Sequence, residues 1–144
     1  MMNATTFLYA LGALIFLALA DFFLKLSSTR ISNQLGTLVY AGVALIVAAI
    51  WVAWEKFSGA EFRVTTEGLL AASLVGVCFA LVVVFLSRTF ASGGNLSVAA
   101  PAIRLSALVL ASALGITILG EQITWRWIFG VVLTFAGIYF IVTR

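Results

Sequence analysis

Three ionisable residues lie inside or beside long apolar segments, where charged side chains are costly and are usually tied to a function. Asp21 and Lys25 are four residues apart, so a helix would place both on one face. Arg104 lies within a later apolar run. Groups of this kind can pair with one another or bind a polar molecule. We expect Asp21, Lys25 and Arg104 to form a charged cluster at one mouth of a central cavity.

The residues needed for most enzymatic chemistry are missing. The sequence has no histidine, which removes the commonest metal ligand and the usual proton carrier at neutral pH. No second carboxylate is spaced to form an acid–base pair with Glu121, and Cys78, the only cysteine, lies within an apolar run. The eight basic residues are scattered and form no nucleic-acid surface. We therefore predict that the protein is not an enzyme and has no catalytic residues, metal site or cofactor.

The composition indicates that a lipid bilayer surrounds these residues. Hydrophobic residues make up 64% of the 144 residues, charged residues make up 9%, and the mean hydropathy is +1.22. A soluble core of this size cannot hide so much apolar surface. Runs of about 18 apolar residues can cross the hydrocarbon region as helices. We predict an all-α membrane protein, a single domain over residues 1–144, with five spans at about Phe7–Leu24, Leu35–Trp54, Leu69–Leu86, Val98–Leu119 and Trp127–Val142.

The first apolar run is predicted to remain as a helix. Its end, Ala18-Leu19-Ala20, resembles a signal cleavage site. No Lys or Arg precedes the run, however, so the positive region of a secretory signal is absent and we expect no cleavage.

The order of the spans would bring two of the charges to a similar depth. If successive helices alternate in direction, the first span ends on the side where the fourth begins. Arg104 lies seven residues past Ser97, which is about 10 Å along a helix. Asp21 and Arg104 could then pair across antiparallel helices. The alternative is that Lys25 and Arg104 extend to the lipid headgroups and that Asp21 lies at the interface.

The fourth and fifth spans carry signals for their ends. Ser97 is predicted to cap the fourth span, with Pro101 in its first turn, where a missing amide costs little. Thr124 is predicted to cap the fifth span. The carboxylate of Glu121 could accept hydrogen bonds from the first amides of the fifth span. The alternative for Glu121 is a role in proton coupling.

Small residues recur one turn apart on three of the predicted spans. In lipid, such stripes let helix backbones approach closely, which is a main source of helix association. They could serve packing within the chain or a contact between subunits, and we predict the fifth span for the subunit contact. The stripes are Ala72, Gly76 and Ala80; Ala107, Ala111 and Gly115; and Gly130, Thr134 and Gly137.

The basic residues give almost no signal for orientation in the membrane. With alternating helices, one side would hold Lys56, Arg63 and Arg126, and the other would hold Lys25, Arg30, Arg88 and Arg144. Orientation follows the excess of Lys and Arg in cytoplasmic loops. This balance predicts either a weak orientation with the C-terminus inside or insertion in both directions, and the latter would allow an inverted pair of identical chains.

Two segments carry a resemblance to a known family. Gly94 to Pro101 read G-N-L-S-V-A-A-P, and Leu119 to Tyr139 read L-G-E-Q-I-T-W-R-W-I-F-G-V-V-L-T-F-A-G-I-Y. Together with Asp21-Phe22-Phe23-Leu24-Lys25, this resembles the EamA-like domain of the drug/metabolite transporter superfamily, where a Lys is usual near the end of the first helix. Unlike the four-helix multidrug relatives, the chain has no Glu in the middle of the first span, so proton-driven multidrug export is not expected.

The resemblance implies an exporter or exchanger of small metabolites. Larger members of the superfamily comprise ten helices as two inverted five-helix repeats, so this chain is equivalent to one half of such a transporter. A second copy, possibly antiparallel, or a homologous five-helix subunit would complete it.

We therefore expect a homodimeric transporter, surrounded by membrane lipid in the bacterial cytoplasmic (inner) membrane, that moves a small-molecule substrate by alternating access. Two alternatives stay open. One is a small transmembrane subunit that scaffolds a larger complex, which a stoichiometric foreign partner would favour. The other is half of a lipid-carrier flippase, which a cavity open laterally to lipid would favour.

Overall fold

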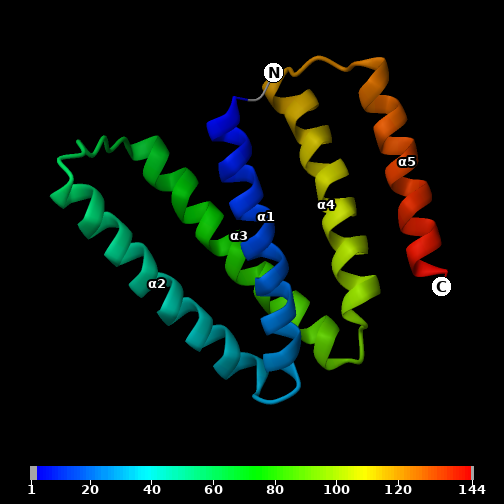
Figure 1. The fold of residues 1–144 in the computed structure, drawn as a ribbon, viewed down its shortest axis with the longest axis horizontal. Coiled ribbons are helices and arrows are strands. Elements are labelled where there is room, and N and C mark those ends of the chain that lie inside the picture. The colour runs from blue at the N-terminus through cyan, green and yellow to red at the C-terminus, as the bar shows by residue number, and fades with distance from the viewer. Residues whose placement is uncertain (1–2, 144) are drawn as a thin grey trace. The chain divides into compact units, whose positions relative to one another are not determined.

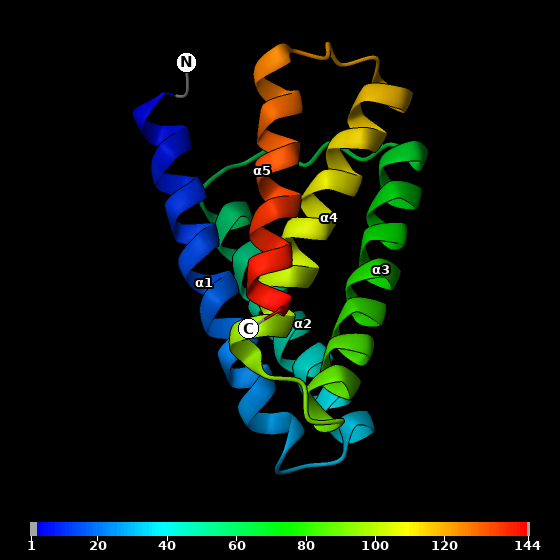
Figure 2. The same ribbon diagram turned by 90° about the vertical axis from the view of Figure 1, so that its right-hand side faces the viewer.

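The computed structural model describes residues 3–143 as five α-helices joined by loops (Figure 1 and Figure 2). Residues 3–143 contain no strand, and each helix is long and apolar enough to cross a membrane. These findings confirm the predicted all-α membrane fold with five spans. Arg144, which was counted among the basic residues above, lies outside the described residues. The helices are α1 (Ala4–Ser28), α2 (Asn33–Phe57), α3 (Thr66–Ala91), α4 (Leu96–Leu119) and α5 (Trp125–Val142).

Each helix extends beyond the apolar run that predicted it, and α1 shows the physical reason. The predicted span ended near Leu24, whereas α1 continues to Ser28. The hydroxyl groups of Ser27 and Ser28 donate hydrogen bonds to the carbonyl oxygens of Leu24 and Lys25, at 3.0 Å and 2.9 Å. Polar residues therefore end the apolar run without ending the helix, because their hydroxyl groups donate hydrogen bonds to carbonyl oxygens of the last turns.

Helix α3 has a capped start and a glycine at its end. The Thr65 hydroxyl accepts a hydrogen bond from the Gly68 amide at 3.1 Å. Glu67 places negative charge in the first turn, where the helix dipole favours it. The helix ends at Ala91, and Gly93 then adopts a positive φ of 97°. This conformation favours glycine, so the chain can reverse here without strain.

Residues up to Gly93 form one compact unit, in which α1 and α2 each pack against α3. The three helices converge where α1 ends, α2 begins and α3 ends, and they separate toward the opposite end (Figure 1 and Figure 2). Away from the converging end, α3 is exposed at every residue from Thr66 to Val82. The described residues of this unit that are buried lie toward the converging end: Asp21, Val83, Leu86, Ser87 and Phe90.

Residues from Gly94 onward form a second compact unit, in which α4 packs against α5. Gly120 ends α4 in the left-handed conformation, with a φ of 69°. The amides of Gly120 and Glu121 both donate to the carbonyl oxygen of Gly115, which closes the last turn. Because the chain divides into these two units, the single domain over residues 1–144 stays a prediction.

The start of α4 differs from the prediction. The helix begins at Leu96 with Asn95 as its N-cap residue, and the Asn95 carbonyl oxygen accepts two amide hydrogen bonds from the first turn. Ser97 therefore lies inside the helix, and Pro101 is its sixth residue instead of a first-turn residue. Because proline has no amide hydrogen, α4 lacks the bond that would reach the Ser97 carbonyl. The side chain of Asn95 makes no capping bond, so α4 begins here without the side-chain cap that was predicted at Ser97.

The start of α5 lies where the sequence placed it. Thr124 is the N-cap residue, and its hydroxyl accepts a hydrogen bond from the Trp127 amide at 3.3 Å. The Thr124 carbonyl oxygen accepts the same amide at 3.0 Å. The first amides of a helix have no carbonyl partner within it, and Thr124 supplies acceptors for one of these amides in α5.

Candidate functional site at the contact of α1 with α3

The two charged residues of the first span lie near the converging end of the first unit. Asp21 is buried, with 8% of its surface exposed, and Lys25, one turn later, is half-buried. Their spacing places both on one face of α1. A buried carboxylate in an apolar segment is costly unless hydrogen bonds or an opposite charge compensate it. Ionisable residues inside membrane spans are rare and usually functional, so this end of α1 is a candidate site.

Lys25 connects α1 to the end of α3. Its Nζ donates a hydrogen bond to the carbonyl oxygen of Phe90 at 3.2 Å. The same ammonium lies 5.5 Å from the centroid of the Phe90 ring. The Phe90 carbonyl belongs to the last turn of α3, where the helix dipole is negative and favours a cation. Lys25 therefore links the two helices by charge as well as by contact.

One face of α3 supplies the packing beside these charges. The buried residues of α3 are Val83, Leu86, Ser87 and Phe90, which recur at helical spacing and form one stripe. Phe90 has only 1% of its surface exposed, and Ser87 has 4%. The ring of Phe90 thus fills the tightest part of this unit, and Ser87 is the polar member of the stripe.

Arg104, the third residue of the predicted cluster, belongs to the second unit. It lies eight residues after the start of α4 and is half-buried. Its predicted pairing with Asp21 would join the two units and stays a prediction. Within the first unit, the group that is brought together is Asp21, Lys25 and the end of α3.

Glu121 follows α4, and its carboxylate turns back onto that helix. A Cβ atom added at Gly115 would lie 2.7 Å from Oε2 of Glu121 and 3.0 Å from its Cδ. The Trp127 amide, near the start of α5, is bonded to Thr124. The carboxylate lies over Gly115 because a residue without a side chain leaves room for it. Glu121 therefore covers the end of α4, and its predicted bonds to the first amides of α5 stay a prediction.

Most of the small-residue positions have open surroundings. A Cβ atom added at Gly76, Gly130 or Gly137 would meet nothing within 4 Å. The Thr134 hydroxyl donates to the Gly130 carbonyl oxygen at 2.8 Å, within its own helix. Gly115 is the exception, because it is buried. The exposed positions are Ala72, Gly76, Ala80, Ala107, Ala111 and Gly130. In a membrane, these stripes are open to lipid or to another protein.

Ser87 and Phe90 were not predicted as part of the site. In a helix that is apolar on all sides, the spacing of apolar residues does not show which face is buried. Ser87 offered a weak signal, because it and Arg88 interrupt an otherwise apolar run. The bond from Lys25 uses a backbone carbonyl oxygen, which the identity of residue 90 cannot reveal.

A comparison with protein families agrees with the five apolar helices. The sequence profile of the EamA-like transporter family matches residues 4–143. The chain belongs to this family. Family membership implies transport of a small-molecule substrate by a multi-pass integral membrane protein, and members are typically not enzymes. No curated protein and no solved structure matches the sequence of this EamA-like protein.

The chemistry available to this EamA-like protein is that of polar recognition. Among residues 3–143, no group of three or more His, Cys, Asp or Glu side chains could hold a metal ion. The site at α1 and α3 combines a buried carboxylate, an ammonium and a backbone carbonyl oxygen. Such groups can bind a polar molecule through charge-assisted hydrogen bonds.

Proposed function

We propose that this EamA-like protein is a homodimeric transporter that moves a small polar or amphipathic metabolite by alternating access. The proposal depends on one observation, the charged contact of α1 with α3 at one end of an otherwise apolar three-helix unit. Ionisable residues inside membrane spans are rare and commonly mark a substrate path. Asp21 and Lys25 could bind a polar substrate or hold a contact that opens and closes.

The arrangement of the helices in the first unit is suited to a movement about one end. Its helices are joined at one end, where Phe90 is buried, and separate toward the other. Rigid helices that share a contact at one end can rotate about it with little repacking elsewhere. We infer that the contact of α1 with α3 acts as the hinge of the alternating-access movement.

The exposed helix faces of the same unit favour contact with a second subunit. Helix α2 is exposed at every residue from Leu38 to Trp54, and an added Cβ atom at Gly12 or Gly42 would meet nothing within 4 Å. A path for a polar substrate needs walls that keep it from lipid. A second copy of this chain could supply those walls and would give the ten helices of the larger members of the superfamily.

Native mass spectrometry of the protein released from mild detergent tests the dimer. We expect the mass of two identical chains to dominate. A monomer, or a complex of one chain with a stoichiometric foreign protein, would contradict the homodimer. The latter result would favour a scaffold subunit instead of a transporter.

Transport by reconstituted protein tests the function. Proteoliposomes loaded with a broad panel of labelled metabolites should move at least one of them. Asp21→Asn should then lower its initial rate on the order of tenfold, because a charged hydrogen-bonding partner is lost from a buried position. The matched control is Glu67→Gln, which removes an exposed carboxylate from the first turn of α3.

The Asp21 result is informative only if the variant folds. Its elution from a sizing column and its helix content should therefore match those of the unmodified protein. Movement of no metabolite would contradict transport. Full transport by both Asp21→Asn and Arg104→Gln would contradict a role for the predicted charged cluster.

A further inference from the structure

One face of α3 carries a row of exposed side chains that follows the helical spacing of three and four residues. Its large apolar members are open: Leu74 has 65% of its surface exposed, Leu81 has 49% and Phe85 has 65%. Successive residues of a helix turn by about 100°, so this row lies opposite both the buried stripe of α3 and its small-residue stripe. The contacts that α3 makes within the chain therefore leave the row open. Its members are Leu74, Cys78, Leu81, Phe85 and Arg88.

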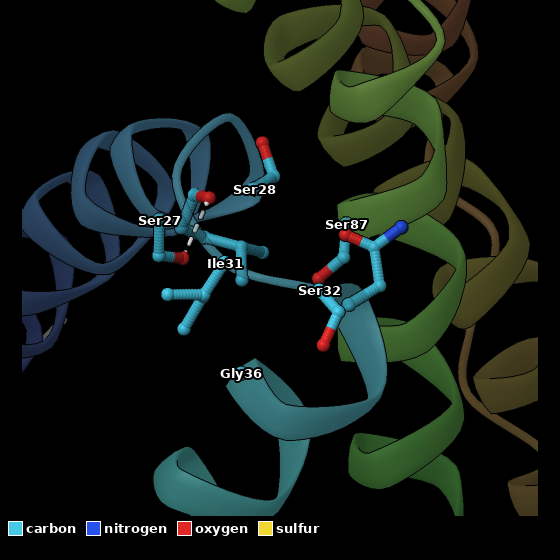
Figure 3. Close-up of a pocket in the computed structure, with 8 residues that line it drawn as sticks. Ser27, Ser28, Ile31, Ser32, Gly36 and Ser87 are labelled. Carbon is cyan, nitrogen blue, oxygen red and sulfur yellow. Dashed lines mark hydrogen bonds between the residues drawn. The ribbon is translucent and has the colours of Figure 1, made fainter.

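The length of the apolar segment places Arg88 at the membrane surface. Glu67 and Arg88 lie on the same side of α3, and residues 68–87 between them contain no charged side chain. Their separation of 21 residues corresponds to about 32 Å of helix, which matches a hydrocarbon core of about 30 Å. Serine side chains of α1 and α3 also gather at the Arg88 end, around a pocket with room for about one water molecule (Figure 3). Arg88 therefore lies at the level of the lipid headgroups.

The charges of the first unit are divided unequally between its two ends. Its glutamates all lie where α2 ends and α3 begins: Glu55, Glu61 and Glu67. At the converging end, Arg30 and Arg88 are exposed, whereas the carboxylate of Asp21 is buried. Exposed basic residues at the headgroup level attract anionic lipids. The surface around Arg88 is therefore suited to an anionic headgroup.

The Arg88 side chain is available to bind such a headgroup. Its guanidinium group makes no hydrogen bond or ion pair with the part of the chain that the structure describes, residues 3–143. A guanidinium group presents several donors in one plane, which matches the oxygen atoms of a phosphate. Phe85 and Leu81 precede Arg88 by about one and two turns, so an acyl chain of the same lipid would lie along them.

We propose that Arg88 and the apolar row before it bind one anionic phospholipid. Arg88 binds the phosphate of the headgroup, and the row contacts an acyl chain. A zwitterionic lipid offers the row the same chain, but its neutral headgroup is attracted less strongly to the basic end of the unit. The site does not depend on the transport function proposed above, and it lies on the face of α3 opposite the small residues.

Cys78 provides a probe for the test, because it is the only cysteine and is exposed within the row. It lies ten residues before Arg88, about 15 Å along the helix, which is the depth of the acyl-chain ends. The full chain, with a thiol-linked fluorophore on Cys78, is reconstituted in phosphatidylcholine vesicles. A small fraction of the lipid is brominated near the chain ends and is either phosphatidylglycerol or phosphatidylcholine. Bromine quenches on contact, so the quenching reports which lipid occupies the row.

Brominated phosphatidylglycerol should quench more strongly than brominated phosphatidylcholine at the same fraction. Arg88→Gln should lower the preference for phosphatidylglycerol by about fivefold, which is the contribution of one basic residue near an anionic surface. The matched control is Arg63→Gln, which removes an exposed arginine from the opposite end of the first unit. This control should keep the preference of the unmodified protein.

Equal quenching by the two lipids in the unmodified protein, or a preference that Arg88→Gln leaves unchanged, would overturn the proposal. Quenching by neither lipid would also overturn it, because another protein surface would then cover the row. A second measurement needs no variant, since salt screens exposed charges. The preference for phosphatidylglycerol should fall when about 0.5 M salt is added, and a preference that stays the same would contradict the role of Arg88.

Discussion

Lys25→Met is expected to lower the free energy of unfolding by about 2 kcal/mol, because a hydrogen bond from a charged donor contributes roughly 1.5–3 kcal/mol. Methionine keeps the length and much of the apolar stem of lysine but removes the donor that bonds the Phe90 carbonyl oxygen at 3.2 Å. The Gly93 amide still donates to that oxygen at 3.2 Å, so the carbonyl is not left empty. The loss should therefore include that of this charged bond and of its attraction to the end of α3. Denaturant unfolding in detergent micelles measures it.

The matched control for this variant is Lys56→Met. Lys56 also lies in the last turn of its helix, α2, but its side chain is exposed. Exposed charges near a helix end contribute only some tenths of a kcal/mol, so this variant should unfold almost as the unmodified protein does. If both variants lose the same free energy of unfolding, the loss comes from removing any positive charge near a helix end. The bond of Lys25 to Phe90 would then not stabilise the contact of α1 with α3.

The outline of the fold could be predicted because a membrane restricts what an apolar chain can do. Backbone groups in lipid must bond within their own segment, so each long apolar run has to form a helix. Helix ends were harder to predict, because a helix can begin without a side-chain cap. At α4 the helix begins at Leu96, one residue ahead of Ser97, although the Asn95 side chain makes no capping bond, and Pro101 therefore lies in the second turn. At α5 only Thr124 was available, and the cap lies there.

The site could be predicted only in part, and for a different reason. Charges inside apolar runs are rare enough to mark Asp21 and Lys25 without any structure. The residues that surround Asp21 and Lys25 depend on which face of α3 is buried. Because α3 has apolar residues on every side, their spacing does not predict the buried face. One partner of Lys25 is a backbone atom, which sequence cannot reveal. The exposed position at Gly76 also looks in sequence like the buried position at Gly115. Such distinctions depend on contacts that the spacing of residue types does not reveal.

Phe90→Ala is expected to cause the largest loss of stability of any single substitution considered, about 3 kcal/mol. Removing a large buried ring leaves a cavity that a packed helix contact closes only in part, and Phe90 has 1% of its surface exposed. The value lies at the lower end of the range for soluble proteins, because the lipid around an unfolded helix is itself apolar and lessens the transfer term. Phe85→Ala on the same helix is the control. Its ring is 65% exposed, so its removal should cost far less.

The double variant Lys25→Met with Phe90→Ala shows how these two residues act together. The hydrogen bond of Lys25 reaches the backbone of residue 90, which alanine retains, whereas the ring contact at 5.5 Å is lost with the side chain. The two losses should therefore nearly add, with a coupling of about 0.5–1 kcal/mol from the cation–ring attraction. A much larger coupling would mean that removing the ring also releases the end of α3 from Lys25. In that case packing by Phe90, and not the charge on Lys25, would hold α1 to α3.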